Sequence, residues 1–257
     1  MTKILAINGS PRARRGNTDK ILQPFLNGAA EAGATTETLY LKELRIQECQ
    51  GCYACHMVTP GRCVLKDDMA RVTEKMLAAD VLVFASPLYV FSVSALLKAL
   101  LDRMIVFGSL DLEVKDGVVV HPPRWPEKKW TWVIVSNAGF PEREHFAPLE
   151  DLFRRFARAI GGGTQVTIGG MILKGMGEMF SVPALLPNYE WFFDACRQAG
   201  REVVRDGSIA EATQEILDRP LVEISMEEFA AMSNAFIEMA VKKARKRKKE
   251  AAPERGG

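Results

Sequence analysis

The chain has 257 residues, of which 47% are hydrophobic and 26% are charged, and its formal net charge is +2 at pH 7. This composition is ordinary for a globular protein, and no segment approaches the roughly 20 uninterrupted apolar residues of a membrane span. The length suits one large domain or a domain with an extension. The chain starts with a predicted strand and a glycine turn rather than a secretory pattern, so the expected compartment is the cytoplasm.

Charge is distributed unevenly along the chain. Seven of the eight residues from Lys242 to Lys249 are basic, whereas residues 1–241 sum to −4. A basic run can bind nucleic acid or an anionic membrane. An acidic body, however, gives no broad electrostatic footprint for nucleic acid. We therefore predict a solvated helix end that continues into a basic, disordered tail within 242–257, with neither a membrane nor nucleic acid as partner.

Strand-like and helix-like patterns alternate along the first 172 residues. This alternation is typical of a parallel sheet covered on both faces. Five strands fit an α/β, flavodoxin-like, doubly wound fold with strand order 2-1-3-4-5. The predicted strands are 3–8, 35–41, 81–85, 130–136 and 164–172, the helices between them are 17–33, 67–79, 92–107 and 144–160, and further helices are expected at 183–207 and 226–249.

The predicted organisation is a domain at 1–175, a helical extension at 176–241 and the tail at 242–257. Two connections in the domain, 42–66 and 109–129, are longer than the 2–6 residues usual between a strand and a helix. The first carries four cysteines. It leaves the carboxyl end of the second strand, at the sheet edge where open α/β folds bind ligands.

The segment 9–18, Gly-Ser-Pro-Arg-Ala-Arg-Arg-Gly-Asn-Thr, links the first strand to the first helix. Backbone N–H groups and the helix dipole there favour an anion such as a phosphate. Ser10, Asn17 and Thr18 add short polar groups, and Arg12 adds a charged fork. The Gly-Lys-Ser/Thr ending of an ATPase loop and the Gly-x-Gly-x-x-Gly fingerprint of a dinucleotide site are both absent. The alternative is a plain turn and helix cap.

Two further loops follow the third and fourth strands and are expected at the same sheet edge. Backbone groups in these loops can bind the polar rim of a flat heterocycle while an aromatic side chain packs on it. For each aromatic residue alone, simple packing is the alternative. The candidate residues are Pro87, Leu88 and Tyr89 in one loop and Asn137, Gly139 and Phe140 in the other.

These loop sequences together resemble the NAD(P)H-dependent FMN reductase family over about residues 1–172. The spacing Cys49-x2-Cys52-x2-Cys55-x7-Cys63, followed by Val-Leu-Lys-Asp-Asp-Met, resembles the iron–sulfur flavoprotein branch of that family. The resemblance implies FMN held by the three loops, a [4Fe–4S] cluster held near the flavin by these cysteines, a homo-oligomer, and NAD(P)H as a possible electron donor.

The cysteine spacing also has an interpretation of its own. Three thiolates three residues apart can wrap one compact inorganic core that a fourth completes, whereas zinc usually takes two separated pairs. Zinc and metal-free, redox-active thiols remain the alternatives. His56 is a possible ligand, but the sequence favours an ordinary loop histidine. Cys196 is predicted to be a packed apolar residue.

The predicted function is an FMN-dependent oxidoreductase, an electron-transfer iron–sulfur flavoprotein between NAD(P)H or a ferredoxin-like carrier and a small redox substrate. No side chain is predicted to be catalytic. Asp67 and Asp68 are expected to be acids at a helix N-terminus. His121 and Arg124 either reach the flavin or a substrate anion, or belong to a proline-stiffened surface loop. The alternatives are a cluster-free NAD(P)H-dependent flavin, quinone or nitro-compound reductase, and a non-catalytic redox sensor or nucleic-acid-associated carrier.

Overall fold

The structure is a computed structural model that describes residues 1–115, 117–160 and 164–250, the last five by their backbone only. The chain forms two compact units, Met1–Arg219 and Pro220–Gly257. The first unit contains every predicted site residue. The second contains the long helix α8, Met226–Glu250, which includes most of the basic run. The rest of the predicted disordered tail, residues 251–257, lies outside the described part of the chain.

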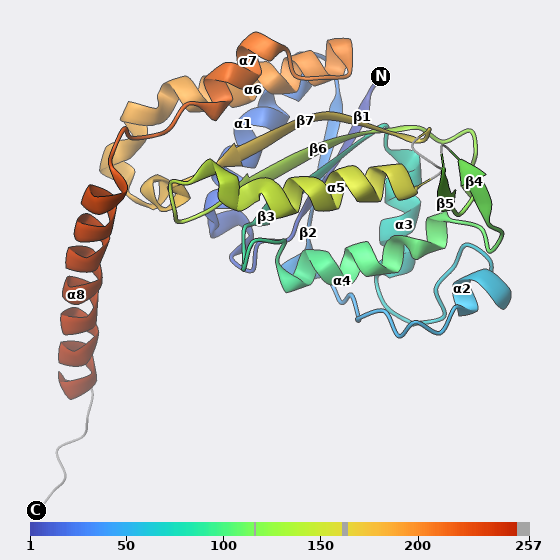
Figure 1. Cartoon of the computed structure of the whole chain (residues 1–257), viewed down its shortest axis with the longest axis horizontal. Helices are drawn as coiled ribbons and strands as arrows, with labels where there is room; N and C mark the ends of the chain where they lie inside the picture. Colours follow the sequence, from blue (N-terminus) through green and yellow to red (C-terminus); the bar gives the residue numbers. More distant parts are fainter. Residues whose placement is uncertain (116, 161–163, 251–257) are drawn as a thin grey trace, which may run out of the picture. The chain divides into compact units, whose positions relative to one another are not determined.

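A five-stranded parallel sheet with the order β2-β1-β3-β6-β7 forms the centre of the first unit (Figure 1). In order of appearance along the chain this is 2-1-3-4-5, so the predicted doubly wound topology is confirmed. The central strand β3 is buried along its whole length, as an unbroken apolar run between two helical layers requires. The strands are β1 Lys3–Asn8, β2 Thr35–Tyr40, β3 Val81–Pro87, β6 Trp130–Asn137 and β7 Val166–Lys174.

Helices cover both faces of this sheet (Figure 1). Helices α3, α4 and α5 pack on one face, where the side chains of Leu5, Leu82 and Trp132 join the largest apolar cluster. Helices α1 and α6, with α7 beside them, cover the other face. The helices are α1 Asn17–Glu31, α2 Ala54–Met57, α3 Met69–Ala78, α4 Ala95–Arg103, α5 Ala147–Ala159, α6 Glu190–Asp206 and α7 Glu211–Asp218.

Helices α1 and α6 cross with unusually little space between their backbones. A Cβ atom added to Gly28 would lie 1.8 Å from the carbonyl oxygen of Arg197, and one added to Gly200 would lie 2.0 Å from that of Phe25. Glycine is therefore required on both helices, because no side chain fits between them. Through this crossing α6, which comes late in the chain, packs against α1, the helix that follows the predicted phosphate loop.

Several predicted helices begin later or end earlier than expected. Helix α4 starts at Ala95, because Ser94 caps it by accepting a hydrogen bond from the Leu97 N–H at 3.3 Å. The stretch predicted as helix from 183 is a 3₁₀ segment, Pro183–Tyr189, before α6 begins. Pro183 and Pro187 lie in this segment, and a proline removes a backbone donor that an α-helix needs.

Two short helices and a hairpin have no counterpart among the predictions. Helix α2 lies inside the cysteine connection, and α7 lies between the two predicted C-terminal helices. The other long connection contains an antiparallel hairpin of β4, Glu113–Lys115, and β5, Val118–Val120. Both long connections are thus partly structured segments rather than plain loops.

Candidate functional site

The predicted phosphate loop is a tight turn closed over a serine hydroxyl. Ser10 is buried, and its backbone N–H donates to Oδ1 of Asn8 at 2.9 Å. The Arg12 N–H donates to Oγ of Ser10 at 3.3 Å. A Cβ atom on Gly16 would lie 2.5 Å from that same Oγ, so the turn requires glycine there. The loop holds a fixed shape directly before α1.

Asn17, the first residue of α1, carries a buried and unpaired hydrogen-bond donor. Its Oδ1 accepts from Oγ of Ser181 at 2.9 Å. Its Nδ2 is buried and has no hydrogen-bond partner in the part of the chain that the structure describes. An unsatisfied buried donor costs about 1–3 kcal/mol, and the helix N-terminus around it favours negative charge. These residues fit the phosphate group of FMN.

Arg12 lies at the rim of this loop rather than inside it. Its side chain is half exposed, and Nη2 is 3.9 Å from Oε1 of Glu178. An exposed pair of this length contributes at most about 1 kcal/mol. The guanidinium is therefore held only weakly and is available to an anion bound beside Ser10 and Asn17.

Hydrogen bonds join the three predicted loops at one edge of the sheet. Nδ2 of Asn137 donates to Oγ1 of Thr18 at 2.8 Å, which connects the loop after β6 to α1. The Leu88 N–H donates to the carbonyl oxygen of Asn137 at 2.8 Å, which connects the loop after β3 to the same residue. Asn137 and Thr18 are buried, as is Pro87. The predicted flavin-binding residues thus converge, as the strand order requires.

The two predicted aromatic residues form an exposed rim around these loops. Tyr89 is 47% exposed and Phe140 is 58% exposed, so neither is a core residue. Val90 and Phe91, which follow Tyr89 in the chain, have φ angles of 48° and 60°. A β-branched residue in this region is strained, and such strain concentrates at binding sites. The loop after β3 therefore holds a costly shape beside the flavin-binding edge.

His145 and Phe91 also belong to this rim, although neither was predicted to. The imidazole ring of His145 contacts the rings of Phe91 and Phe140, with centroids 5.4 and 5.7 Å apart and planes nearly perpendicular. His145 lies in the 3₁₀ segment Arg143–Phe146, directly before α5. Only its distance in space to the two phenylalanines reveals the connection, and no spacing in the sequence encodes it.

The four clustered cysteines line one pocket, together with Tyr53, Leu65, Arg103 and Ile105. Cys49 and Cys52 are exposed, Cys55 is buried and Cys63 is intermediate. All four are free thiols. Burial, and next the nearby Cys63, raise the pKa of the Cys55 thiol. Within residues 1–115, 117–160 and 164–250, no three His, Cys, Asp or Glu side chains are arranged to hold a metal ion.

A buried ion pair forms the floor of the cysteine pocket. Nη1 and Nη2 of Arg103 donate to the two carboxylate oxygens of Asp67 at 2.8 and 3.1 Å, and both side chains are almost completely buried. Nη1 also donates to the carbonyl oxygen of Gln47 at 2.8 Å. Arg103 thus holds both ends of the cysteine connection, lines the same pocket as the four thiols, and lies close to Cys63.

The pair shifts the pKa of both of its members. Burial alone would raise the pKa of Asp67, but hydrogen bonds from Arg103 and from the N–H groups of Gln47 and Met69 hold it below its usual value. Burial alone would lower the pKa of Arg103, but the contacts with Asp67 and Cys63 raise it. Asp67 does accept from the first residue of α3, as predicted. The ion pair with Arg103 was not foreseen.

The second long connection packs against the cysteine connection. The rings of His121 and His56 stack with centroids 5.9 Å apart. Arg124 donates to the carbonyl oxygens of Val106 and Gly108 at 3.3 and 3.0 Å, and Trp125 packs on Phe107. These contacts fit the packed alternative for this loop. His56 is buried, and neither ring nitrogen has a hydrogen-bond partner among the described residues.

Lys174, at the end of β7, is a buried cation. Its Nζ donates to the carbonyl oxygens of Leu217 and Arg219 at the end of α7. It also lies 4.5 Å above the centroid of the Phe192 ring. Burial lowers the pKa of Lys174 to about 8 and raises that of the Cys196 thiol. Cys196 is buried, as predicted.

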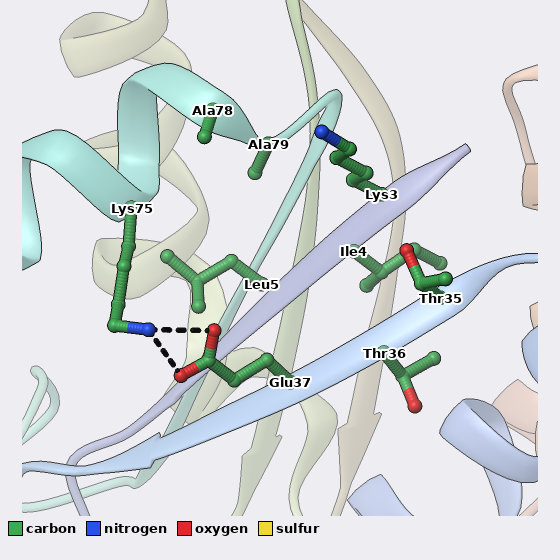
Figure 2. Close-up of a pocket in the computed structure, with 9 residues that line it drawn as sticks. All are labelled: Lys3, Ile4, Leu5, Thr35, Thr36, Glu37, Lys75, Ala78 and Ala79. Carbon is green, nitrogen blue, oxygen red and sulfur yellow. Dashed lines mark hydrogen bonds and ion pairs between the residues drawn. The ribbon is translucent and has the colours of Figure 1, made fainter. Parts of the chain in front are cut away.

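A shallow groove lies at the opposite edge of the sheet from these loops (Figure 2). It is formed where β1 and β2 begin and α3 ends. Nζ of Lys75 donates to both carboxylate oxygens of Glu37 there, at 2.7 and 2.9 Å. None of the predicted site residues is among the described residues that line it. The groove is therefore separate from the candidate site.

The fold and the site define a flavodoxin-like α/β protein with a predicted phosphate loop and a pocket lined by four cysteines. Residues 2–124, just under half of the chain, match the model of the NADPH-dependent FMN reductase family. No helix within the described ranges combines the length and apolar character needed to cross a membrane.

Two relatives are iron–sulfur flavoproteins. The protein from Archaeoglobus fulgidus is 42% identical over 101 residues, which are 39% of this chain and 48% of the relative. The protein from Methanosarcina thermophila is 37% identical over 116 residues, which are 45% of this chain and 59% of the relative. The chain therefore spans about half the length of the curated relatives it matches.

Solved structures support the fold independently. The NAD(P)H:quinone oxidoreductase from Methanothermobacter marburgensis is 23% identical and has a TM-score of 0.56, with 79% of this chain and 96% of that chain covered. The FMN-dependent NADH-azoreductase from Bacillus anthracis is 13% identical and has a TM-score of 0.55, with 79% and 100% covered. At these identities the likeness concerns the fold alone.

Proposed function

We propose that the chain is an FMN-dependent oxidoreductase that passes electrons between NAD(P)H or a ferredoxin-like carrier, FMN and a [4Fe–4S] cluster. The observation that carries the proposal is the convergence of the three loops through Asn137, which bonds to Thr18 on one side and Leu88 on the other. The family match over residues 2–124 supports it. So do the names of the iron–sulfur flavoprotein relatives.

In this proposal the loop before α1 holds the phosphate of FMN. Nδ2 of Asn17 supplies the unpaired donor, Ser10 keeps the turn in shape, and Arg12 adds charge from the rim. Residues Pro87, Leu88 and Tyr89, with Asn137, Gly139 and Phe140, hold the ring. When bound, FMN supplies hydride and electron transfer. The exposed aromatic rim leaves room for a small redox substrate beside it.

The four cysteines are proposed to hold the cluster, which supplies one-electron transfer when bound. The buried guanidinium of Arg103 faces the same pocket and favours negative charge on the sulfur atoms. Thiols must lose their protons before they bind a metal, and a positive group beside Cys63 favours the thiolate form that binds.

A second candidate is a cluster-free NAD(P)H-dependent flavin, quinone or nitro-compound reductase. The observation that favours it is the arrangement of the sulfur atoms, since no three of these side chains converge on a metal position among the described residues. Two of the four thiols are also exposed. In this case Cys49 and Cys52 act as redox-active thiols or have no part in the reaction.

Anaerobic purification followed by measurement of flavin, iron and acid-labile sulfide separates the two candidates. We expect about one FMN and about four iron atoms per chain. Cys63→Ser should lose iron and keep FMN, whereas Cys196→Ala, outside the pocket, should keep both. FMN without iron in the unaltered chain would favour the second candidate. A colourless chain with neither cofactor would refute both.

The partners and compartment are proposals as well. We propose a homo-oligomer, with a small redox substrate or a ferredoxin-like carrier as the exchange partner, and the cytoplasm as the compartment.

A further inference from the structure

Helix α8 presents a regular apolar stripe. Phe229, Met232, Phe236 and Met239 follow one another at intervals of three, four and three residues. This is the a/d spacing of two heptads, which places all four side chains on one face of a helix. Phe236 is 68% exposed and Met239 is 62% exposed. Apolar groups of this size gain free energy when another surface covers them.

The start of α8 is fixed by a capping box. The Glu228 N–H donates to Oγ of Ser225 at 3.2 Å, and the Glu228 carboxylate accepts from the backbone N–H and the hydroxyl of Ser225. These hydrogen bonds hold the pKa of Glu228 below its usual value. The helix therefore has a defined first turn, and the heptad positions keep their register from there.

We propose that α8 pairs with α8 of a second copy of this chain, antiparallel and centred near Asn234. In this register Phe229 lies opposite Met239 of the second copy, and Met232 lies opposite Phe236. Each apolar residue then meets an apolar residue. The proposal goes beyond the redox function and does not depend on it.

Charge favours the antiparallel orientation. The first turn of α8 carries Glu227 and Glu228, and the later part carries Lys242, Lys243 and Arg245. An antiparallel pair places Glu228 beside Lys242 of the second copy at both ends of the contact. A parallel pair would place lysine beside lysine and glutamate beside glutamate. Charges that flank an apolar seam select orientation in this way.

Small residues flank the centre of the stripe. Ser233 and Ala235 lie on either side of it at the proposed two-fold axis, and Ala240 lies one turn further along. Small side chains at these positions allow two helix backbones to approach closely. The same register that pairs the apolar residues brings Ala235 beside Ala235 of the second copy. One alignment therefore satisfies the apolar, the charged and the small positions together.

An anionic membrane fits α8 less well than a second copy does. Helices that lie in a membrane surface carry basic residues along the polar face. Here Glu227 and Glu238 lie on that face beside the stripe, and the basic residues are collected after Met239. Because the stripe covers only two heptads, the helix pair is a weak contact, and the fraction of paired chains rises with chain concentration.

Thiol cross-linking of the full chain tests the proposal. Ala235→Cys is treated with a short bis-maleimide, and peptides that join residue 235 to residue 235 are measured by mass spectrometry. Such a link can form only between two copies, so the native cysteines do not confuse it. Asn234→Cys, its neighbour on the opposite face, is the matched control. We expect the 235–235 link to be several-fold more abundant than the 234–234 link.

Four results would overturn the proposal. Equal yields at 234 and 235 would show random collision. A dominant 232–232 link in Met232→Cys would show parallel pairing. An Ala235→Cys link that survives Phe236→Lys would show that the stripe is not the contact, provided that circular dichroism finds the helix intact. Loss of the link on adding anionic vesicles, with the chain sedimenting on them, would assign the stripe to a membrane instead.

Discussion

Replacing Arg103 by methionine should destabilise the first unit strongly. The substitution leaves the Asp67 carboxylate buried without its cation. Removing one member of a buried pair costs about 3–5 kcal/mol. Asp67 keeps hydrogen bonds from the N–H groups of Gln47 and Met69, at 2.9 and 3.1 Å, so we expect the lower end, about 3 kcal/mol. For a unit of this size that lowers Tm by about 6–12 °C.

Denaturant unfolding of the unloaded chain measures this loss without any cofactor. Asp102→Asn is the control, because Asp102 is the adjacent residue and its ion pair with Lys98 is exposed. It should cost less than about 0.5 kcal/mol. The double variant Arg103→Met with Asp67→Asn should cost less than the sum of the two single changes. Additive costs, or a loss below about 1 kcal/mol for Arg103→Met, would refute the reasoning.

The pH dependence gives a second test of the same pair. Because the folded pKa of Asp67 lies below its unfolded value, the stabilisation is complete above the unfolded pKa of about 3.9. It should be lost as the pH falls through the lower, folded pKa. Arg103→Met should therefore flatten the acid limb of the stability profile. An unchanged acid limb would mean that other carboxylates control it.

Three further predictions concern other parts of the first unit. Because burial lowers the pKa of Lys174 to about 8, unfolding should cost more as the pH rises from about 8 to 10.5, by up to about 3 kcal/mol, and Lys174→Met should remove this rise in pH-dependent denaturation. Gly28→Ala should destabilise the chain by at least about 2 kcal/mol, because the added Cβ has no space. The control Asn27→Ala changes an exposed residue and should alter the unfolding free energy by less than about 0.5 kcal/mol. Equal effects of the two substitutions would contradict the close crossing. Asn17→Leu should weaken FMN binding about tenfold in a fluorescence titration while leaving the stability of the unloaded chain within about 1 kcal/mol, and an unchanged affinity would exclude Asn17 as a phosphate ligand.

The sheet was predictable because its strands have few alternatives. An apolar run such as Val81–Pro87 is buried on both faces, and only a central parallel strand between two helical layers places it there. The convergence of the predicted loops followed from this order, since carboxyl ends of parallel strands share one edge. Boundaries were less well predicted, because local caps such as Ser94 and prolines such as Pro187 set them.

The parts that escaped prediction depend on contacts between distant segments. The pair of Arg103 with Asp67 joins the end of an apolar helix to the cysteine connection, and neither residue has a local signal for the other. The same is true of His145 beside Phe91 and Phe140. The cysteine spacing predicted that four thiols would gather, which the shared pocket supports, but spacing cannot set the exposure of each sulfur atom.

The glycine crossing between α1 and α6 has a consequence for the order of events during synthesis. Helix α1 leaves the ribosome early, but α6, which covers it, belongs to the last part of the compact unit. At about 5–20 residues per second, the apolar side of α1 stays uncovered for on the order of ten seconds. Asn17 also lacks its hydrogen bond from Ser181 until that later part of the chain has been made. Cofactor capture is therefore expected after translation of the unit ends, and a chain truncated before α6 should be retained by chaperones rather than bind flavin.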